Sequence, residues 1–554
     1  MSDDSRLKLR VLPLGGLGEI GLNMMIVALG KDAFIIDTGL MFPDESMPGV
    51  DKVIPDLDVV IRQDWNVLGI ILTHGHLDHI GALPYVLKKI PAPIYATRLT
   101  MGLIENILEE FGLMGSSVRN VVTADSIVQL GPFEIGFFAM CHSVADGVGL
   151  AIKTRAGVIL HSGDFKLDPT PIDGRLCDLE KIAGYARNEV LALLSDSTNV
   201  ENTGNTLSEC MIRPAFETIF KEASGRILIA TFSSNIHRIQ QVIHLAQEFG
   251  RKVVLVGRSM VSNAKIAADR GYLDIPDGIM VDMKDMESLP DEKVTVLSTG
   301  SQGEPMSALS LMALDRHKFL RVKPGDVVVL SSKFIPGNER AITHNINEFS
   351  RRGARVMYEK VSDVHVSGHA SEEELRYLIR LVHPKCFIPI HGEYRHLLRH
   401  AHIARDEGID SVLVAQDGDL VEISHEGARV IEQVEVGRVF VHGKGVGDVG
   451  HDVLRDRRTL SEVGFVTVVL VINKETGRTI AGPEVRSQGV TFDEVEPELL
   501  EGVRISIEEQ LAELDPGTPE EWNHYEEQIR RAVRRYINRI LGRKPLVQTI
   551  VLKV

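Results

Sequence analysis

Residues 71–79, Ile-Leu-Thr-His-Gly-His-Leu-Asp-His, bring together the side chains best suited to chemistry in this chain. They include His74, His76, Asp78 and His79, whose donor atoms suit zinc or manganese. A single histidine in a surface loop is usually only solvated. Four ligand-type residues within six positions, with a glycine that allows a tight turn, indicate a metal site instead.

Three further candidate side chains follow apolar runs elsewhere in the sequence. His142 comes after residues 133–140, and Asp164 comes after residues 157–161. Asp37 ends a third apolar run, where it is placed to orient a metal-bound histidine. Ligands of layered α/β proteins cluster where strands end, so these positions extend the first cluster. Each of them alone is as consistent with a structural role.

The elements that must position these residues are short strands that alternate with helices. Residues 67–72 are an apolar run that predicts a buried strand ending just before the histidine cluster. Residues 80–89 and 101–111 have helical spacing. The other strands predicted in this region are residues 7–14, 24–29, 33–37, 133–140 and 157–161, and another begins within 91–96.

Gly16-x-Gly18-x-x-Gly21 matches the dinucleotide-binding fingerprint in spacing. That motif needs a helix directly after it, whose N-terminus faces the pyrophosphate. Here residues 23–29, Asn-Met-Met-Ile-Val-Ala-Leu, read as a strand. We therefore reject a nucleotide-binding function for this loop.

Length and composition are those of an ordinary globular protein. A chain of 554 residues is too long for one core and predicts about three domains. No apolar segment reaches the roughly 18 residues of a membrane span, and the first residues lack the apolar core of a signal peptide. We therefore expect a cytoplasmic protein. The cysteines have neither zinc-finger nor redox spacing and are expected to be buried thiols: Cys141, Cys177, Cys210 and Cys386.

The net charge of −16 comes from 61 basic and 77 acidic side chains. Non-specific nucleic-acid binding usually relies on a basic surface, so this charge disfavours it. A nucleic-acid substrate would have to be held by metal ions and local basic patches.

The order of the candidate residues resembles that of the metallo-β-lactamase superfamily: Asp37, then His74-x-His76-x-Asp78-His79, then His142, then Asp164. Asp196 in Leu-Ser-Asp-Ser-Thr-Asn, His369 and His391 resemble the signature of its β-CASP nuclease branch. Within that branch the chain is similar to the ribonuclease J family in four stretches: Thr231-Phe-Ser-Ser-Asn-Ile-His-Arg, Ser298-Thr-Gly-Ser-Gln-Gly-Glu-Pro, His365-Val-Ser-Gly-His369 and Pro389-Ile-His-Gly-Glu.

The resemblance implies an α/β fold in which residues 1–210 and 356–447 form a four-layer αββα metallo-β-lactamase domain. An inserted β-CASP α/β domain would occupy residues 211–355. A linker at 448–462 and a small α+β C-terminal domain at 463–554 would complete the chain. The sequence agrees independently for the insertion, because helix-length segments separate four apolar runs there, at residues 226–232, 252–257, 294–299 and 326–331.

The resemblance also implies two divalent metal ions. His74, His76 and His142 would hold one ion, Asp78, His79 and His391 would hold the other, and Asp164 would bridge both. Zinc suits the histidines, while manganese or magnesium would tolerate the carboxylates. Such a pair can present a shared water as hydroxide to a phosphodiester. The expected catalytic residues are Asp78, His369 as proton donor to the leaving oxygen, and Asp196 as support.

Two turns are the binding sites that the resemblance implies for substrate phosphates. One consists of His365, Val366, Ser367, Gly368 and His369, before a helix predicted over residues 371–381 whose N-terminal N–H groups could bind an anion. The other consists of Ser233, Ser234 and Asn235. By residue type alone, the first could be a capping turn and the second ordinary N-cap chemistry. The resemblance further implies a structural calcium site, matched by Gly49, Asp51 and Asp448.

The C-terminal region combines β-prone and helical segments, with strands predicted at residues 463–472 and 548–554. One apolar helical face is predicted between them: Ile529, Val533, Ile537 and Ile540. Five arginines project mostly elsewhere on this helix: Arg530, Arg531, Arg534, Arg535 and Arg539. They could contact RNA, but such a stripe more often pairs with acidic neighbours, here Glu526 and Glu527. We favour self-association as the role of this domain.

The resemblance as a whole implies a ribonuclease that hydrolyses RNA phosphodiesters in RNA maturation and decay. It would act as a 5′-to-3′ exonuclease that prefers 5′-monophosphate ends, with additional endonuclease activity. Its expected partners are RNA, further copies of the chain in a dimer or tetramer, and other RNA-decay proteins, but no membrane. One alternative is a hydrolase of a small thioester or lactone, against which the large insertion and the two turns speak. Another is a non-catalytic RNA-binding scaffold, whose expected mark is a lost metal ligand.

Overall fold

The structure is a computed structural model that describes residues 8–44, 46–304, 306–334, 337–474, 476, 478–491, 495–513 and 522–554. The chain forms two compact units, of which the first consists of Met1–Phe42 and Val53–Val439. The second consists of Pro43–Lys52 and Phe440–Val554. Leu7, where the first predicted strand begins, lies outside the described residues.

Two sheets make up the centre of the larger part of the first unit. One has eight strands in the order β23-β22-β1-β3-β4-β6-β7-β8, and the other has seven in the order β21-β19-β13-β12-β11-β10-β9. The strands of the first sheet are β1 (Leu9–Gly15), β3 (Met24–Leu29), β4 (Asp32–Ile36), β6 (Asn66–Ile71), β7 (Ile94–Thr97), β8 (Arg119–Val122), β22 (Asp419–Ser424) and β23 (Gly427–Gln433). Those of the second are β9 (Ile127–Leu130), β10 (Phe133–Ala139), β11 (Val148–Thr154), β12 (Gly157–His161), β13 (Val190–Asp196), β19 (Cys386–Ile390) and β21 (Ser411–Val412).

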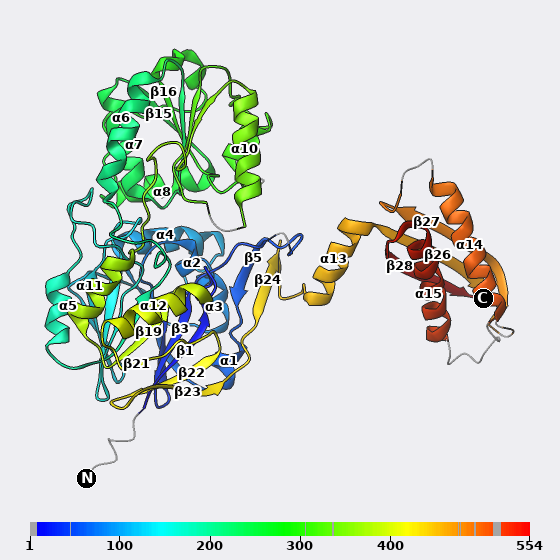
Figure 1. Ribbon diagram of the computed structural model, residues 1–554, viewed down its shortest axis with the longest axis horizontal. Helices are drawn as coiled ribbons and strands as arrows, with labels where there is room; N and C mark the ends of the chain where they lie inside the picture. Colours follow the sequence, from blue (N-terminus) through cyan, green and yellow to red (C-terminus); the bar gives the residue numbers. More distant parts are fainter. Residues whose placement is uncertain are drawn as a thin grey trace, which may run out of the picture. The chain divides into compact units, whose positions relative to one another are not determined.

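The two sheets face each other across a shared apolar core, in which the rings of Phe34 and Phe133 meet edge to face with their centroids 5.0 Å apart. Helices pack on the two outer faces (Figure 1). Those on the first sheet are α1 (Asp58–Arg62), α3 (Leu83–Lys89) and α4 (Arg98–Glu110), and those on the second are α5 (Leu179–Ala186), α11 (Glu372–Val382) and α12 (Tyr394–Asp406). This four-layer αββα arrangement confirms the predicted fold class.

The helix predicted over residues 80–89 is wrong in its extent. The structure instead has α2 (Leu77–Ile80) and α3, separated at Gly81 and Ala82. Pro84 lies in the first turn of α3, where its missing N–H costs no hydrogen bond. Because of this break, the helix axis of α2, which contains Asp78 and His79, does not have to follow the axis of the packed helix α3.

The chain between α5 and α11 includes the inserted domain, which has a parallel sheet of its own. Its five strands are all parallel and follow the order β15-β16-β14-β17-β18. Along β14, Ile227 and Ile229 face one helix layer, and Leu228 and Ala230 face the other. The strands are β14 (Ile227–Ala230), β15 (Lys252–Val256), β16 (Val294–Ser298), β17 (Val327–Leu330) and β18 (Arg355–Met357). The first four lie within the four predicted runs.

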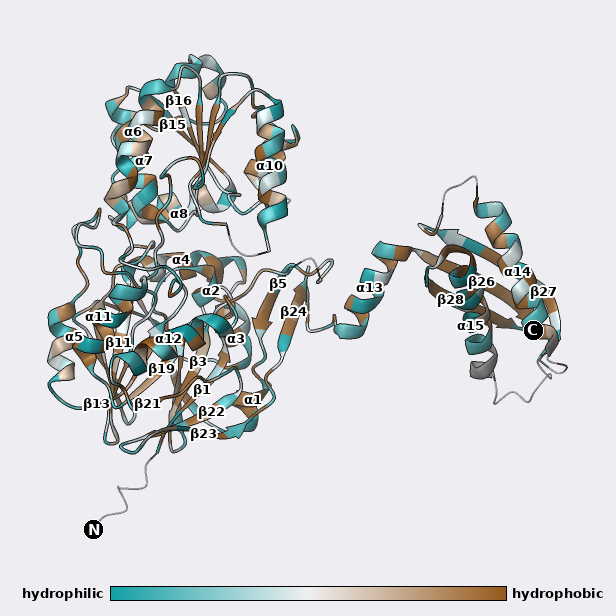
Figure 2. Cartoon of the chain, in the orientation of Figure 1, coloured by the Kyte–Doolittle hydropathy of each residue, from teal (hydrophilic) through white to brown (hydrophobic). Residues whose placement is uncertain are grey.

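Helices cover both faces of this parallel sheet, and Figure 2 shows its apolar strands between helices with polar outer surfaces. On one side lie α6 (Arg213–Glu222), α7 (Ile236–Glu248) and α8 (Arg258–Asp269), and on the other α9 (Ala308–Ala313) and α10 (Glu339–Arg351). The 3-10 helices of this region are η2 (Glu209–Ile212), η3 (Met286–Ser288) and η4 (Asp291–Lys293).

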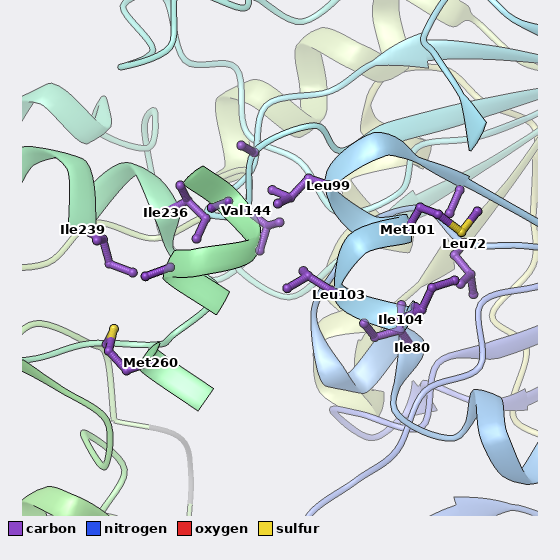
Figure 3. Close-up of a cluster of buried hydrophobic side chains, with 14 of the residues drawn as sticks. Leu72, Ile80, Leu99, Met101, Leu103, Ile104, Val144, Ile236, Ile239 and Met260 are labelled. Atoms are coloured by element: carbon purple, nitrogen blue, oxygen red, sulfur yellow. The ribbon is translucent and has the colours of Figure 1, made fainter. Parts of the chain in front are cut away.

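An apolar cluster joins the inserted domain to the rest of the first unit. Leu99 and Leu103 of α4 extend toward Ile236 at the start of α7, and Val144 lies beside them (Figure 3). Met260 of α8 continues the same cluster. Because all of these side chains are buried, the inserted domain is held against the sheet that carries the histidine cluster.

The second unit contains a three-stranded sheet in the order β27-β26-β28 and two helices packed on it. Its elements are α13 (His451–Val463), β26 (Phe465–Ile472), β27 (Thr479–Gln488), α14 (Glu496–Glu513), α15 (Trp522–Leu541) and β28 (Leu546–Lys553). Short strands stand where the chain passes between the units, β5 (Lys52–Pro55), β24 (Arg438–His442) and β25 (Gly445–Val446). Among the described residues, no helix is both long and apolar enough to cross a membrane.

Three of the four residues on the predicted apolar face of α15 are buried, namely Ile529, Val533 and Ile537, whereas Ile540 is 53% exposed. Ile540 has the helical spacing of this face but lies one residue before the helix ends, and it is the member of the predicted set that is not buried. Neither β27 nor α14 was expected from the sequence. Most of the predicted linker at residues 448–462 is helical, in α13.

Candidate metal centre

Side chains from both central sheets converge at one edge. His74 and His76 lie in the loop after β6, and the short helix α2 carries Asp78 and His79. The ligand atoms of one group all lie within 4.8 Å of one another: His74, His76, His142 and Asp164. Those of a second group do the same: Asp78, His79 and His391. The structure thus brings together all seven residues for which metal contacts are expected.

Asp164 faces both groups at once. Its Oδ2 atom lies 3.7 Å from His74 Nε2 in the first group. The same oxygen lies 3.2 Å from His79 Nε2 and 3.4 Å from His391 Nε2 in the second group. A single carboxylate oxygen between two sets of imidazole nitrogens is the geometry that a bridging ligand needs.

The donor set fits divalent metal ions. Burial holds the pKa of His74 and of His142 well below the ordinary histidine value, so both rings are neutral and have a free lone pair. Burial also lowers the pKa of His76 to about 4. The buried Nε2 atom of His391 has no hydrogen-bond partner among the described residues, although a buried ring nitrogen normally has one.

The field of the site favours positive charge. Burial disfavours the charged form of His79, but the carboxylates of Asp164, Asp37 and Asp78 outweigh it and raise the pKa of His79 well above its ordinary value. For His391, burial is likewise outweighed, chiefly by Asp164, and the pKa rises to about 9. The carboxylates therefore attract cations into this buried space, as a metal centre requires.

Hydrogen bonds from outside the cluster orient the rings. Asp37 Oδ2 lies 2.7 Å from His79 Nδ1, and Thr198 Oγ1 lies 2.6 Å from His391 Nδ1. The Nδ1 atom of His142 lies 2.8 Å from the carbonyl oxygen of Gly368. Because each Nδ1 atom is engaged in this way, the Nε2 atom of each ring is directed to the centre of the site.

Sequence reasoning missed two residues that touch this centre. The side-chain amide of Asn23 lies 3.1 Å from His79 Nε2 and donates to the carbonyl oxygen of Asp78. A Cβ atom on Gly39 would lie 1.7 Å from the same carbonyl oxygen. Asn23 lies two residues after the glycine loop at residues 16–21. Asn23 could have been found by asking which polar residues stand next to this loop, once its dinucleotide-binding role had been rejected.

The glycine loop itself supports His391. Strand β2 (Leu17–Gly18) pairs in parallel with β20 (Gly392–Glu393), the two residues directly after His391. The backbone N–H of Gly392 also donates to the carbonyl oxygen of Gly16 over 3.2 Å. No helix follows the loop, as the rejection of a dinucleotide site requires.

Asp196 and His369 form a pair beside the metal ligands. His369 Nδ1 lies 2.7 Å from Asp196 Oδ2, and the ring of His369 has its centroid 4.8 Å from that of His142. Asp196 is buried, whereas the His369 side chain is 20% exposed. The pair therefore offers a partly accessible imidazole that a buried carboxylate holds in place.

The turn at residues 365–369 lies against the metal centre, but one expectation about it is wrong. The N–H groups at the start of α11 are already used, because that of Glu372 donates to the Asn202 carbonyl and that of Glu373 to the Gly204 carbonyl. A capping box between Ser371 and Glu374 closes the same turn. An anion would therefore have to be bound by the turn itself.

In the triplet at residues 233–235, Asn235 has a structural role and the two serines are partly exposed. Asn235 caps α7, since its Oδ1 atom accepts a hydrogen bond from the backbone N–H of Arg238. Ser233 Oγ accepts from the side-chain amide of Asn263. Ser233 and Ser234 are half-buried, while Asn235 is buried. The N-cap alternative thus describes Asn235 correctly.

Two of the residues matched to calcium lie close to other polar groups. The carboxylate of Asp51 accepts a hydrogen bond from the backbone N–H of Gly443. Near Gly49, the guanidinium of Arg457 donates to the carbonyl oxygen of Pro48. In the described part of the chain, Asp51 and Asp448 belong to no group of three His, Cys, Asp or Glu ligand atoms. Such a group does not include a backbone carbonyl oxygen such as that of Gly49, so the calcium site stays a prediction.

Two layered sheets with a His/Asp centre at their edge and an inserted parallel α/β domain define a metal-dependent hydrolase of the metallo-β-lactamase class. Residues 17–200 match the model of the metallo-beta-lactamase superfamily, and residues 224–349 match that of the ribonuclease J beta-CASP domain. Residues 353–414 match the Zn-dependent metallo-hydrolase RNA specificity domain, and residues 452–554 the ribonuclease J C-terminal domain. The chain belongs to the ribonuclease J family and is a metal-dependent ribonuclease.

Similar proteins cover nearly the whole chain. Ribonuclease J of Synechocystis is 39% identical over 97% of this chain and 86% of its own length. Ribonuclease J of Thermus thermophilus is 38% identical over 98% and 95%, and that of Helicobacter pylori strain 26695 is 38% identical over 96% and 78%. A crystal structure of a protein of unknown function from Enterococcus faecalis V583, 15% identical, covers 75% of this chain and 100% of its own with a TM-score of 0.52, which indicates a shared fold.

Proposed function

We propose that the chain hydrolyses RNA phosphodiesters at a two-metal centre. The observation that carries this proposal is the position of Asp164 Oδ2 between the two ligand groups, with the turn at residues 365–369 packed against them. His74, His76 and His142 would hold one ion and Asp78, His79 and His391 the other. When bound, two such ions supply a hydroxide from a shared water and neutralise charge on the phosphoryl oxygens.

His369 is the proposed proton donor to the leaving oxygen. Its Nδ1 atom donates to Asp196, so its Nε2 atom is left to face the substrate. The hydrogen bond to the carboxylate fixes the ring so that a proton on Nε2 can be passed to the leaving oxygen. Asp196 therefore acts by holding His369 in place, and it does not itself contact the phosphate.

The proposed substrate is RNA with a 5′-monophosphate, degraded from the 5′ end, with additional internal cleavage, in RNA maturation and decay. Membership of the ribonuclease J family supports this direction of attack. Residues 233–235 and 365–369 are proposed to bind substrate phosphates. In support of this, one buried residue links the two turns: the backbone N–H of Arg238 donates to Asn235, and its guanidinium contacts His365.

A double substitution tests the metal mechanism. Asp78→Ala with His79→Ala removes two ligands of one group and is expected to reduce cleavage of labelled RNA to background while unfolding stays cooperative. The matched control is Asp410→Ala with His425→Ala, which removes the same side chains from exposed positions. Undiminished RNA turnover by the first variant would refute the mechanism.

A pair of substrates tests the polarity. One RNA sequence is prepared with a 5′-monophosphate and with a 5′-hydroxyl, and both are digested side by side. Faster release of mononucleotides from the 5′ end of the first is expected. Equal rates without a 5′ mononucleotide product would contradict the exonuclease proposal, yet leave hydrolysis itself intact.

Self-association through the C-terminal domain is a further proposal, with a dimer or tetramer as its product. On β26 the residues that face the helices are buried, whereas Phe465, Val469 and Val471 on the other face are half-buried. Ile550 and Leu552 of the edge strand β28 are 37% and 50% exposed. A second copy that covers this apolar face would bury them. Val469→Lys with Ile550→Lys is expected to lower the mass found by sedimentation equilibrium, and an unchanged mass would count against the proposal.

The identity of the metal, the compartment, the domain bounds and the role of the arginines in α15 are also proposals. Zinc is the expected metal, with manganese or magnesium as alternatives, and metal analysis of the purified protein decides among them. The cytoplasm is the expected compartment, and the four free cysteines are typical of reducing conditions. The proposed domains are residues 1–210 with 356–447, 211–355 and 463–554. In the described parts of α15, Arg530 and Arg531 bind Glu527, which favours ion pairing over RNA contact for these two.

A further inference from the structure

Arg238 is a fully buried cation between the two proposed phosphate-binding turns. It lies in the first turn of α7, where its backbone N–H binds the Asn235 side chain. Its guanidinium forms a two-point contact with the Glu209 carboxylate, with Nε to Oε1 at 2.9 Å and Nη2 to Oε2 at 3.0 Å. The Glu209 carboxylate balances the buried charge of Arg238. This pair uses two of the three guanidinium nitrogens, and the contacts of the third nitrogen need a separate explanation.

The third nitrogen of the guanidinium reaches the other turn. Arg238 Nη1 donates to the carbonyl oxygen of Ser331 over 2.7 Å and lies 3.0 Å from His365 Nδ1. Ser331 Oγ in turn donates to the carbonyl oxygen of Val364, directly before His365, over 2.6 Å. The buried pair and the end of β17 therefore hold the start of the 365–369 turn from two sides.

The contact with Arg238 determines which nitrogen of His365 carries the proton. A guanidinium has five donor N–H groups and no acceptor. His365 Nδ1 must therefore be the acceptor, and the proton of the neutral ring must be on Nε2. Burial holds the pKa of His365 well below its ordinary value, and three cations, Arg238, Lys333 and Lys166, lower it further.

We propose that Arg238 is a positioning residue that fixes His365 as a neutral Nε2–H donor for a substrate phosphate. This inference rests on the proposed binding of phosphate at residues 365–369. Glu209 balances the buried charge of Arg238, and the remaining guanidinium nitrogen gives the ring of His365 a defined tautomer. Because the pKa of His365 lies well below its ordinary value, the ring is neutral near pH 7 and offers this hydrogen-bond donor there.

The test compares Arg238→Lys with Arg226→Lys in the full-length, metal-loaded protein. Arg226 is a matched control, because it is also buried, belongs to the same inserted domain and forms a two-point contact with the carboxylate of Asp326. Both variants keep the charge of the pair and lose the planar guanidinium, so their losses of stability should be similar. Only Arg238→Lys removes a donor from His365.

Arg238→Lys is expected to raise the KM for a short 5′-monophosphorylated oligoribonucleotide by about tenfold, the effect of one lost hydrogen bond, with kcat within about twofold. Below about pH 6.5 a freed histidine begins to gain a proton, and with it a positive charge that attracts phosphate, so the KM of Arg238→Lys should fall relative to that of the parent protein. Arg226→Lys should leave KM and its pH profile unchanged. Equal KM values for the two variants would overturn the proposal.

A spectroscopic measurement separates this inference from the proposed function. In protein labelled with 15N-histidine, the resonances of His365 are those that His365→Asn removes. An unprotonated Nδ1 and a protonated Nε2 are expected for the parent protein, and a change in this pattern for Arg238→Lys. A protonated Nδ1 in the parent protein would overturn the inference even if RNA is cleaved. If RNA is not cleaved at all, the proposed function fails, and the tautomer pattern still decides the role of Arg238.

Discussion

Asp37→Asn is the substitution that tests most directly how the metal ligands are held. Asp37 makes three hydrogen bonds: Oδ1 accepts from the backbone N–H of Thr73, and Oδ2 accepts from Thr73 Oγ1 and from His79 Nδ1, over 2.8, 2.8 and 2.7 Å. Asn has the same shape, and it also tolerates the left-handed backbone of this position, where φ is 60°. The substitution therefore changes hydrogen bonding and leaves the backbone in place.

Neither orientation of the new amide satisfies all partners. If its NH2 group replaces Oδ2, it faces His79 Nδ1, which must then accept, so the proton moves to Nε2 and blocks the nitrogen that faces Asp164. If the NH2 group replaces Oδ1, it meets the N–H of Thr73 at about 2.8 Å, and two donors face each other. Either way, about 1–3 kcal/mol is lost. That corresponds to a loss of metal affinity of about 10- to 100-fold, the usual effect of removing such an outer hydrogen bond.

Competition with a chelator measures this affinity for the parent protein, Asp37→Asn and a control, Asp32→Asn. Asp32 begins β4, the strand that ends directly before Asp37, and its carboxylate accepts a hydrogen bond at the surface from Asn66. The control should bind metal as the parent protein does. Unchanged metal affinity of Asp37→Asn would refute the claim that Asp37 sets the tautomer of His79.

Two further substitutions test packing and titration. Gly39→Ala would place a Cβ atom 1.7 Å from the Asp78 carbonyl oxygen, so we expect loss of metal binding in chelator competition and destabilisation by more than about 3 kcal/mol in urea unfolding. Gly184→Ala is its control: a Cβ atom there meets nothing within 4 Å on helix α5, and a gain of about 0.5–1 kcal/mol is expected instead. Burial lowers the pKa of His400 to about 3, so the folded state binds fewer protons than the unfolded state once the pH falls below about 6.5. Between pH 7.5 and pH 5 the parent protein should therefore lose about 2 kcal/mol more unfolding free energy than His400→Leu, and parallel losses would show that His400 does not contribute.

The strands and the candidate metal ligands could be located because both depend on local sequence. In the first unit, apolar runs of five to eight residues gave strand positions within a few residues, as at β6 and β12. His74, His76, Asp78 and His79 are contiguous, and His142 and Asp164 follow strands, where side chains of facing sheets meet. The helix break at Gly81 was missed because helical spacing continues across it.

The rest of the site depends on contacts between distant parts of the chain, which no local pattern encodes. Asn23 contacts His79 across 56 positions, and Arg238 contacts His365 across 127. Asn23 follows a glycine loop whose spacing suggests only nucleotide binding. In the sequence, Arg238 is one basic residue of an amphipathic helix, and only its burial distinguishes it from a solvated arginine. The resemblance to a known family supplied the motif containing Arg238, but not its partners.

At two positions of the metal centre the backbone adopts a conformation that non-glycine residues rarely take. Asp37 and His391 adopt left-handed conformations, with φ of 60° and 51°, directly after the buried strands β4 and β19 of the two facing sheets. Such a conformation costs a non-glycine residue about 1–3 kcal/mol and persists only where surrounding contacts determine it. Here the contacts are those of the site itself: Asp37 binds Thr73 and His79, and His391 binds Thr198. Metal binding selects the folded state and so offsets this strain in proportion to its affinity. The two left-handed residues and the candidate ligands therefore belong to the same site, and a metal ion held there would help to stabilise both strand ends in these conformations.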